Sequence, residues 1–341
     1  MAMMNSCRRC LALGSALLLC GFGVAAGSPP STTSDVQSAP GPHAVTTLDT
    51  VWTDASRSRT IPIRMQVPAA TATGTRPTII FSHGLGGSRA GGAVWGRHWA
   101  SHGFIVIHLQ HPGSDDALWR NRGTTPVKEA LMAGFTPAAY VNRIADVRFA
   151  VDEIARRTAA GDGVSMRVDL ARLGISGHSF GARTTLAIAG ERNPGLAGQH
   201  AWSDPRFKAA VAMSPSAPGA AAGWPARFGP ITIPVLSITG TRDGDPFGAD
   251  MPPSQRTEPF RHMPPPHKYL LVLEGVDHFV FNGGDAPRGQ AQVDGAVQRY
   301  VKMVTLAFWQ AWLESDSAAA TWLGEPTMRD VLAGAGTWSA K

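Results

Sequence analysis

The chain has 341 residues, of which 43 % are hydrophobic and 16 % are charged, so it can bury a sizeable core. The formal net charge is +6, but lysines and arginines are spread along the chain without runs, which argues against a nucleic-acid partner. No segment approaches about 20 uninterrupted apolar residues, so no stable membrane span is expected.

Residues 1–26 have the composition of an export signal. Arg8 and Arg9 supply the positive start, an apolar run follows at Leu11–Leu19, and Val24–Ala26 fits the small-residue rule for cleavage. The protein is therefore expected to be secreted or periplasmic.

Cysteine placement bears on both the export route and the chemistry. All three cysteines, Cys7, Cys10 and Cys20, lie inside the expected signal, so the mature chain carries none. Disulfides, thiolate metal sites and a cysteine nucleophile are thereby excluded. Lipoprotein anchoring at Cys20 is disfavoured because Leu19 is large where a small residue is usual. The paired arginines of the signal keep a twin-arginine route open beside the general one.

Three further segments follow the signal. Residues 27–44 are rich in Ser, Thr, Pro and Gly, as in a flexible leader. Residues 45–315 are expected to form one α/β catalytic domain, because no internal repeat or second boundary is visible. Residues 316–341 form a C-terminal extension, either packed on the domain or trailing from it. Removing the signal takes away two arginines and no acidic residue, so the mature net charge is +4.

Short apolar runs predict the strands of the domain. Leu48–Thr53 comes first, and Arg59–Val67 alternates apolar and polar residues, as in a half-exposed antiparallel strand. The later runs are nearly continuous, which is typical of strands buried on both faces of a parallel sheet. These later runs are Thr78–Phe81, Phe104–Leu109, Leu173–Ser176, Phe207–Met213, Val235–Thr239 and Tyr269–Leu273.

Helix-length stretches separate most of these runs. Ala138–Ala160 carries apolar residues at helical spacing, and Ala291–Leu313 is a second long amphipathic candidate. Strands that alternate with helices predict a mostly parallel α/β sheet with helices on both faces and antiparallel strands at its N-terminal edge. Only about twenty residues follow Met213 before the next strand, so no large lid domain is expected there. The loops at 110–136 and 244–267 are left to shape a cleft.

The sequence Gly177-His178-Ser179-Phe180-Gly181 places one serine between two glycines. Its context matters more than the pentapeptide, because Ser179 follows the buried run Leu173–Ser176 and precedes a predicted helix, Ala182–Ala189. The two glycines permit the sharp turn of a strained nucleophile elbow. Ser179 is therefore the expected nucleophile, and the alternative is a corner serine that caps the helix.

A nucleophilic serine also needs a base and a carboxylate, which are expected after it in the order Ser, Asp, His. Asp243 lies just past the next-to-last predicted strand, and His278 lies just past the last one. The carboxyl ends of parallel strands meet at one edge of a sheet, so the three side chains are expected together. The rivals are Asp245 for the carboxylate and, before the last strand, His262 and His267 for the base.

A glycine-rich loop after an earlier strand completes the set. In Phe81-Ser82-His83-Gly84-Leu85-Gly86-Gly87 the backbone can approach a substrate oxygen. The amide N–H groups of Leu85 and of Phe180, which follows the nucleophile, are the expected oxyanion-hole donors. His83 is expected to order its own loop. Further residues that are expected to line the cleft are His178, Trp119, Gly84 and Gly86.

His98 and His102 stand four residues apart on a predicted helix, a spacing that allows a shared metal ion. No Glu follows His98 and no third ligand is evident, so no metal and no cofactor are expected. Asp115 and Asp116 are expected to form a solvated turn.

The order and placement of these elements resemble the α/β-hydrolase family. Within it, His83–Gly87, the following RHWASHGFIVIHLQHPGSDDALWR, GHSFGART and GVDHFVF are similar to bacterial secreted hydrolases of the predicted dienelactone hydrolase type. Those are similar in turn to chlorophyllase and platelet-activating-factor acetylhydrolase relatives. The resemblance covers residues 45–312 and implies an α/β-hydrolase fold, a Ser179–Asp243–His278 triad and hydrolysis of carboxylic esters. True dienelactone hydrolases use a cysteine where this chain has Ser179, so their substrate is not carried over.

The expected function is a serine hydrolase that cleaves small-molecule or polymeric esters through an acyl-enzyme in an open cleft. The same triad serves amide or peptide hydrolysis and acyl transfer, which are the alternatives among enzymes. A non-catalytic binding protein that keeps the fold is the alternative from another class, although it would not require all four parts together. The acyl-chain preference and the oligomeric state stay open.

Overall fold

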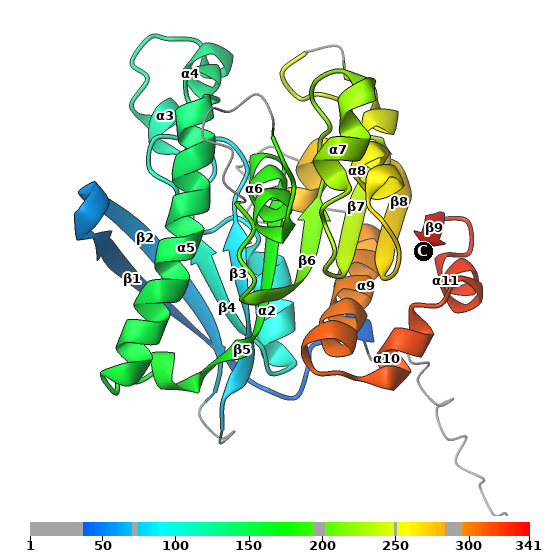
Figure 1. The fold of residues 1–341 in the computed structure, drawn as a ribbon, viewed down its shortest axis with the longest axis horizontal. Coiled ribbons are helices and arrows are strands. Elements are labelled where there is room, and N and C mark those ends of the chain that lie inside the picture. Colours follow the sequence, from blue (N-terminus) through cyan, green and yellow to red (C-terminus); the bar gives the residue numbers. More distant parts are fainter. Residues whose placement is uncertain (1–36, 70–73, 194–201, 249–250, 284–294) are drawn as a thin grey trace, which may run out of the picture.

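The structure is a computed structural model that describes residues 37–69, 74–193, 202–248, 251–283 and 295–341. The expected export signal and most of the expected leader lie outside these residues. Within them, one sheet with helices on both faces organises the chain (Figure 1). None of the described helices has the length and apolar character needed to cross a bilayer.

The described strands form a nine-stranded mixed sheet in the order β1-β2-β4-β3-β5-β6-β7-β8-β9. Neighbours from β4 to β8 run parallel, whereas β1 with β2, β2 with β4 and β8 with β9 pair antiparallel. This sheet confirms the predicted α/β class with antiparallel N-terminal strands. The strands are β1 (Val45–Asp54), β2 (Arg59–Pro68), β3 (Arg76–Ser82), β4 (Ile105–Leu109), β5 (Val168–His178), β6 (Phe207–Met213), β7 (Val235–Arg242), β8 (Lys268–Asp277) and β9 (Gly336–Ala340).

Burial follows the hydrophobic pattern of each strand. Every residue of β4 is buried, and so is every residue of β6 except Lys208. In β1, at the edge of the sheet, most residues are half-buried or exposed. A continuous apolar run is therefore stable where helices cover both faces of the sheet.

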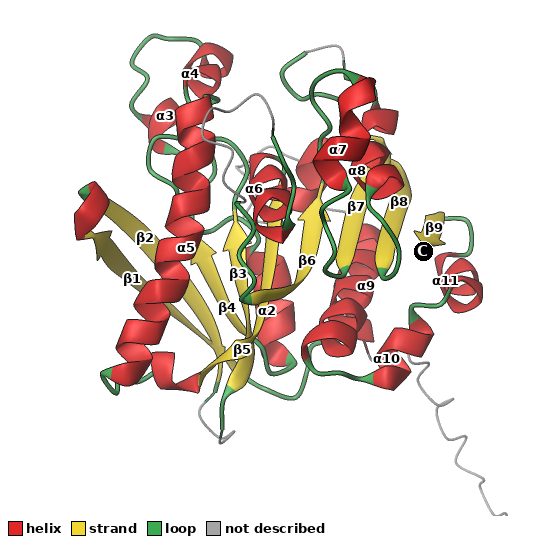
Figure 2. Ribbon diagram, viewed as in Figure 1, coloured by secondary structure: helices red, strands yellow, loops and turns green. Residues whose placement is uncertain are grey.

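Two layers of helices enclose the sheet (Figure 2). Helices α5, α6 and α7 contribute to the core on one face, and α2, α9, α10 and α11 to the core on the other. The helices are α2 (Ala93–Ser101), α3 (Ala117–Arg120), α4 (Val127–Ala133), α5 (Pro137–Ala159), α6 (Phe180–Ala189), α7 (Trp224–Phe228), α8 (Glu258–His262), α9 (Gly295–Leu313), α10 (Ser317–Trp322) and α11 (Glu325–Leu332). Short 3-10 turns are η1 (Ala55–Arg57), η2 (Ser165–Arg167), η3 (Ala221–Gly223), η4 (Pro253–Thr257) and η5 (His278–Asn282). Between β6 and β7 the chain forms just η3 and α7, so no large lid lies there.

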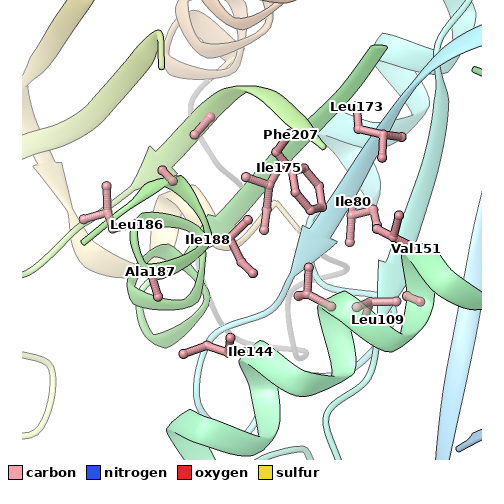
Figure 3. Close-up of a cluster of buried hydrophobic side chains, with 14 of the residues drawn as sticks. Ile80, Leu109, Ile144, Val151, Leu173, Ile175, Leu186, Ala187, Ile188 and Phe207 are labelled. Carbon is pink, nitrogen blue, oxygen red and sulfur yellow. The ribbon is translucent and has the colours of Figure 1, made fainter. Parts of the chain in front are cut away.

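The core on the α5 face is built largely from aliphatic side chains (Figure 3). Ile144 and Val151 are two turns apart on α5, a spacing that turns both toward the sheet. Their buried neighbours from β3, β4, β5, β6 and α6 are Ile80, Leu109, Leu173, Ile175, Phe207, Leu186, Ala187 and Ile188. This packing fixes α5 and α6 relative to the strand ends that carry the candidate site.

Residues 37–44, which the sequence assigns to the leader, pack on α2. The Nε2–H groups of His98 and His102 donate to the carbonyls of Gln37 (2.9 Å) and Ala39 (3.0 Å). The Gly41 amide donates to Ser101 Oγ (2.8 Å). The packed part of the chain thus begins before residue 45, because a leader segment supplies acceptors for two histidines in and just after α2.

The C-terminal extension ends in a strand that extends the sheet. β9 pairs antiparallel with β8, and Lys341 and Lys268 exchange two backbone hydrogen bonds of 2.9 Å beyond it. Trp338 of β9 donates its Nε1–H to the carbonyl of Leu323 (3.1 Å). The extension therefore covers an edge that β8 would otherwise expose.

Candidate active site

The turn between β5 and α6 holds Ser179 in a strained backbone conformation. Its φ of 57° and ψ of −114° fall outside the regions that non-glycine residues favour, at a cost of about 1–3 kcal/mol. A Cβ at Gly181 would lie 1.9 Å from the Ser82 carbonyl oxygen, and one at Gly177 would lie 2.5 Å from the Gly181 backbone. Both glycines are thus required by close backbone approach, and the turn presents the hydroxyl of Ser179 at the sheet edge.

Three residues from three strand ends form one series of hydrogen bonds. His278 Nε2 lies 2.8 Å from Ser179 Oγ, and His278 Nδ1 lies 2.7 Å from Asp243 Oδ1. A carboxylate accepts the proton of Nδ1, which leaves Nε2 free to accept the serine hydroxyl proton. Ser179 follows β5, Asp243 follows β7 and His278 follows β8, so the parallel sheet brings them to one edge.

Asp243 is buried, and several neighbouring groups bind its carboxylate oxygens. Thr239 Oγ1 donates to its Oδ2 (2.8 Å), and Arg256 Nε lies 3.0 Å from its Oδ1. Burial raises the pKa of this carboxyl, but the hydrogen bond from His278 and the charge of Arg256 outweigh burial and lower the pKa overall. Asp243 is therefore ionised near neutral pH, as an orienting carboxylate needs to be.

The rival residues lie elsewhere. Asp245 accepts the amide of Phe247 (2.7 Å) and lines the cavity wall. His262 pairs with Glu258 (3.3 Å) on α8, and His267 is exposed and lies against Trp312. None of these three is hydrogen-bonded to Ser179 in the described part of the chain.

The two predicted oxyanion donors lie on either side of the Ser179 turn. Phe180 is the first residue of α6, so its amide has no acceptor within the helix. Leu85 lies on the loop after β3, where the amides of Gly86 and Gly87 donate to Ser114 and Gly84 carbonyls. The loop approaches Ser179 closely, since a Cβ at Gly84 would lie 3.5 Å from Ser179 Cβ.

The residues that the sequence predicts to line the cleft do not line the cavity. Instead, they contact backbone segments that carry site residues. His178 is buried, and its Nε2–H donates to the His278 carbonyl (2.8 Å). Burial lowers the pKa of His178 to about 3, so it is neutral. Trp119 Nε1 donates to the carbonyl of Gly86 (2.8 Å), whose φ is +71°. Both contacts hold backbone segments that carry site residues, and Gly84 lies against His178 Nδ1.

A cavity of about 330 Å³ opens beside Ser179. Its walls come from the elbow, from the 110–136 segment and from the 244–267 segment, the two loops that the sequence left to shape a cleft. The lining residues are Leu85, Lys128, Met132, Phe135, Ser179, Phe180, Arg183, Ser216, Pro218, Asp245, Pro246, Phe247, Met251, Gln255 and Arg256. Most of the lining is apolar, which suits a substrate with a hydrocarbon body.

Sequence reasoning missed three arginines around the site. Arg256 touches Asp243 and, through Nη2 at 3.1 Å, His278 Nδ1. Arg143 of α5 is fully buried behind the Leu85 loop, and Arg183 of α6 lines the cavity. For Arg183 the sequence did contain a signal. Arg183 comes four residues after Ser179, so it lies one helical turn beyond the serine, on the same helix.

A second serine–histidine–aspartate series lies behind the first. Ser82 Oγ is 2.9 Å from His111 Nε2, and His111 Nδ1 is 3.0 Å from Asp146 Oδ2. All three side chains are fully buried, and Arg57 and Arg59 also bind Asp146. This series links β3, the segment after β4 and α5, and none of its three side chains is exposed to solvent.

His98 of α2 and His102, the residue that follows the helix, lie side by side with ring centroids 4.8 Å apart. Both direct Nε2 at carbonyls of residues 37–44, which accounts for their spacing. No group of three or more His, Cys, Asp or Glu side chains able to hold a metal ion occurs in the described ranges. Asp115 is buried, unlike the solvated turn that the sequence suggests, and accepts a hydrogen bond from Gln110.

Comparison with known proteins gives one family match. The model for platelet-activating factor acetylhydrolase, isoform II, matches residues 44–122. That segment contains β1 to β4 and the Leu85 loop but ends before Ser179, Asp243 and His278.

Three bacterial cutinases are similar over a longer part. The chain is 28 % identical to cutinase est1 of Thermobifida alba over 61 % of this chain and 55 % of that protein. It is 26 % identical to cutinase 1 of Thermobifida cellulosilytica, over 61 % and 62 %, and to a cutinase of Thermobifida fusca, over 61 % and 54 %. The aligned part of the chain thus spans between 54 % and 62 % of the length of these curated relatives.

Proposed function

We propose that this chain, an α/β-hydrolase-type protein similar to cutinases, is a carboxylic ester hydrolase with Ser179 as nucleophile. His278 accepts the Ser179 proton as Oγ attacks the ester carbonyl, and it later protonates the leaving alcohol. Asp243 holds the imidazole by its Nδ1–H and stabilises the imidazolium. The amides of Leu85 and Phe180 donate to the oxyanion, and water then hydrolyses the acyl-enzyme by the reverse sequence of proton transfers.

One observation carries this proposal. The hydrogen-bond series from Asp243 through His278 reaches a strained serine that borders a cavity of about 330 Å³. The Ser82 series has comparable distances, but its three side chains are fully buried, so we assign the chemical role to Ser179.

The cavity favours esters with an apolar body. Met132 and Phe135 line it while remaining 40 % and 41 % exposed, so apolar surface extends from the cavity to its mouth. Cutinase-type relatives, and the absence of a large lid between β6 and β7, support small-molecule or polymeric esters as substrates. The signal-like residues 1–26 support export to the periplasm or the medium.

The test is turnover of graded 4-nitrophenyl esters beside a lactone and an anilide. Wild-type protein should hydrolyse the esters, and Ser179→Ala and His278→Ala should each lose about 10⁴-fold or more in kcat while remaining folded. Ser254→Ala, at an exposed serine outside the cavity lining, is the matched control and should retain activity.

A fluorophosphonate probe separates the remaining interpretations. Labelling of Ser179 with turnover of the anilide but no ester would indicate an amide hydrolase. Absence of any adduct on Ser179 in folded wild-type protein would contradict the proposal and favour a binding protein.

A further inference from the structure

We propose that the cavity contains an anion subsite formed by Arg183, so that the preferred esters carry a carboxylate on their acyl chain. The inference deepens the proposed function and rests on it. It names half-esters of dicarboxylic acids, which combine a hydrocarbon chain with one free carboxylate, as the substrate class.

Arg183 presents a cation that no described side chain neutralises by an ion pair. Its guanidinium lies over the rings of Tyr140, Phe135 and Phe180, with the carbon 4.9 to 5.9 Å from their centroids. Its Nε is buried without a hydrogen-bond partner in the described structure. Aromatic faces hold the guanidinium in place and leave its hydrogen-bonding edge unused.

The charges around the cavity leave a positive surplus. Asp245 interacts electrostatically with Arg256, and Arg256 in turn pairs with Asp243. Glu191 interacts with Arg183 at longer range but is bound by Arg227. Lys128 also lines the cavity and adds a second cation, with its Nζ 3.6 Å from the position of a Cβ built at Gly248.

Helix geometry places the cation at a useful distance from the reacting serine. Arg183 lies four residues after Ser179 on α6, about one helical turn of roughly 5–6 Å. Both residues line the same mostly apolar cavity, so an acyl chain bound to Ser179 can run along the cavity and end at the guanidinium. Arg183 is half-buried and its Nε is buried without a partner, so a charge-assisted hydrogen bond to a substrate carboxylate would satisfy a donor that the folded chain leaves unpaired.

The experiment compares monoethyl with diethyl esters of succinate, adipate and suberate by titrating released acid at constant pH. Arg183→Gln should lower the ratio of kcat/KM for the best monoester to that for its diester by about 10-fold or more. Arg183→Lys should retain most of the ratio. Arg156→Gln, at a 64 % exposed arginine of α5, is the matched control and should leave the ratio unchanged.

An unchanged ratio in Arg183→Gln would overturn the subsite. A binding measurement decides the same point without catalysis: adipate should raise the melting temperature of Ser179→Ala but not of the Ser179→Ala, Arg183→Gln double variant. Equal shifts, or none in either protein, contradict the subsite. Wild-type protein that binds adipate but hydrolyses no ester contradicts the proposed function instead.

We infer independently that Arg143 positions the oxyanion donor of Leu85, an inference that also rests on the proposed function. Arg143 is fully buried, and its Nη1 and Nη2 groups donate to the carbonyls of His83 (2.6 Å) and Gly84 (3.3 Å). Its guanidinium also lies 4.4 Å from the ring centroid of Phe180, the residue that carries the other donor.

His83 holds the same carbonyl. Its Nε2 accepts the His111 amide (3.0 Å), so the ring proton is on Nδ1, which donates to Gly84 O (2.6 Å). A trans peptide is planar, with its C=O and N–H pointing in opposite directions. With the Gly84 oxygen directed at Arg143 and His83, the Leu85 N–H faces away from them and stays available to a substrate.

Replacing Arg143 by Lys keeps the positive charge but removes the planar guanidinium group, whose two terminal nitrogens bind two carbonyls. We expect kcat to fall by about 10²-fold with little change in KM, and affinity for an alkylboronic acid to fall in parallel. His83→Gln should act in the same direction. Arg148→Lys, on the same helix, is the control, because Arg148 donates to the Ser203 carbonyl and is not among the groups that bind the His83 and Gly84 carbonyls.

Wild-type kcat and boronate affinity in folded Arg143→Lys and His83→Gln would overturn this positioning role. A crystal structure of Arg143→Lys gives a readout apart from activity: a rotated Gly84–Leu85 peptide is expected, and an unchanged peptide contradicts the inference. Wild-type protein that neither turns over esters nor binds the boronate contradicts the proposed function.

Discussion

Arg256 Nε lies 3.0 Å from Asp243 Oδ1, and both side chains are buried beside His278. The same guanidinium reaches the Ser214 and Gly244 carbonyls (3.1 and 3.0 Å), so it ties the loop after β6 to the loop after β7. Arg256 therefore places a positive charge beside Asp243 and also fixes the positions of these two loops.

Arg256→Met should move the acid limb of the kcat/KM profile to higher pH, by about one unit. Loss of the cation raises the pKa of Asp243, so the carboxylate that orients His278 becomes protonated, and the site inactive, at higher pH than in the wild type. His178 also faces His278 and is neutral, so it does not mask the effect. Initial rates between pH 4 and pH 9 measure the shift. Arg261→Met, at a 61 % exposed arginine, is the control, and an identical acid limb in Arg256→Met would contradict the prediction.

Gly181→Ala should destabilise the protein by several kcal/mol and abolish activity. The added Cβ would lie 1.9 Å from the Ser82 carbonyl oxygen, which belongs to a central strand and cannot move alone. Gly163→Ala is the matched control, because a Cβ there meets no atom within 4 Å. Urea unfolding of both variants is the measurement. Equal midpoints for the two variants would show that the elbow tolerates a side chain.

Acidification should lower the free energy of unfolding between about pH 6.5 and pH 4. Burial lowers the pKa values of His98 and His178 to about 3 and those of His108 and His111 to about 4. These values lie below the unfolded value of about 6.5, so over this range the unfolded chain binds more protons than the folded one. The stabilisation is complete above the unfolded value and is lost as pH falls toward the folded values. Urea titrations at pH 7.5, 6.0 and 4.5 measure it, and a constant or rising stability would contradict it.

Truncation after Ala335 should lower the melting temperature while leaving kcat/KM at 25 °C nearly unchanged. It removes β9, exposes the edge of β8 and deletes the hydrogen bond from Trp338 to Leu323, all at the side of the sheet away from Ser179. Trp338→Phe should cost about 1 kcal/mol, the usual value of one hydrogen bond. Calorimetry and ester turnover separate stability from activity. A truncated protein with wild-type thermal stability would show that β9 contributes nothing to folding.

The sequence predicted the fold because its strongest signals are local. Nearly continuous apolar runs such as Phe207–Met213 became central strands, and the order of strand ends located Ser179, Asp243 and His278 at one edge. The edge strand β9 gave no such signal, because its five residues are half-buried or exposed and lack an apolar pattern.

The arginines around the site were not predicted from the sequence, for a different reason. Arg256 and Arg143 are surrounded in sequence by residues of ordinary composition, and burial of an arginine depends on carbonyls supplied by distant segments. Arg143 binds His83 and Gly84 from 60 and 59 residues away. Likewise, the sequence placed His178 and Trp119 in the cleft, but neither lines the cavity. The direction in which each side chain points depends on backbone acceptors that no local pattern shows.

The buried series Ser82–His111–Asp146 has a practical consequence for recognising hydrolases by geometry. Its two distances, 2.9 and 3.0 Å, are close to the 2.8 and 2.7 Å of the series that ends at Ser179. A three-residue distance template would therefore return two matches in this one protein. A template that also required a positive φ at the serine and open space beside Oγ would return Ser179 and reject Ser82.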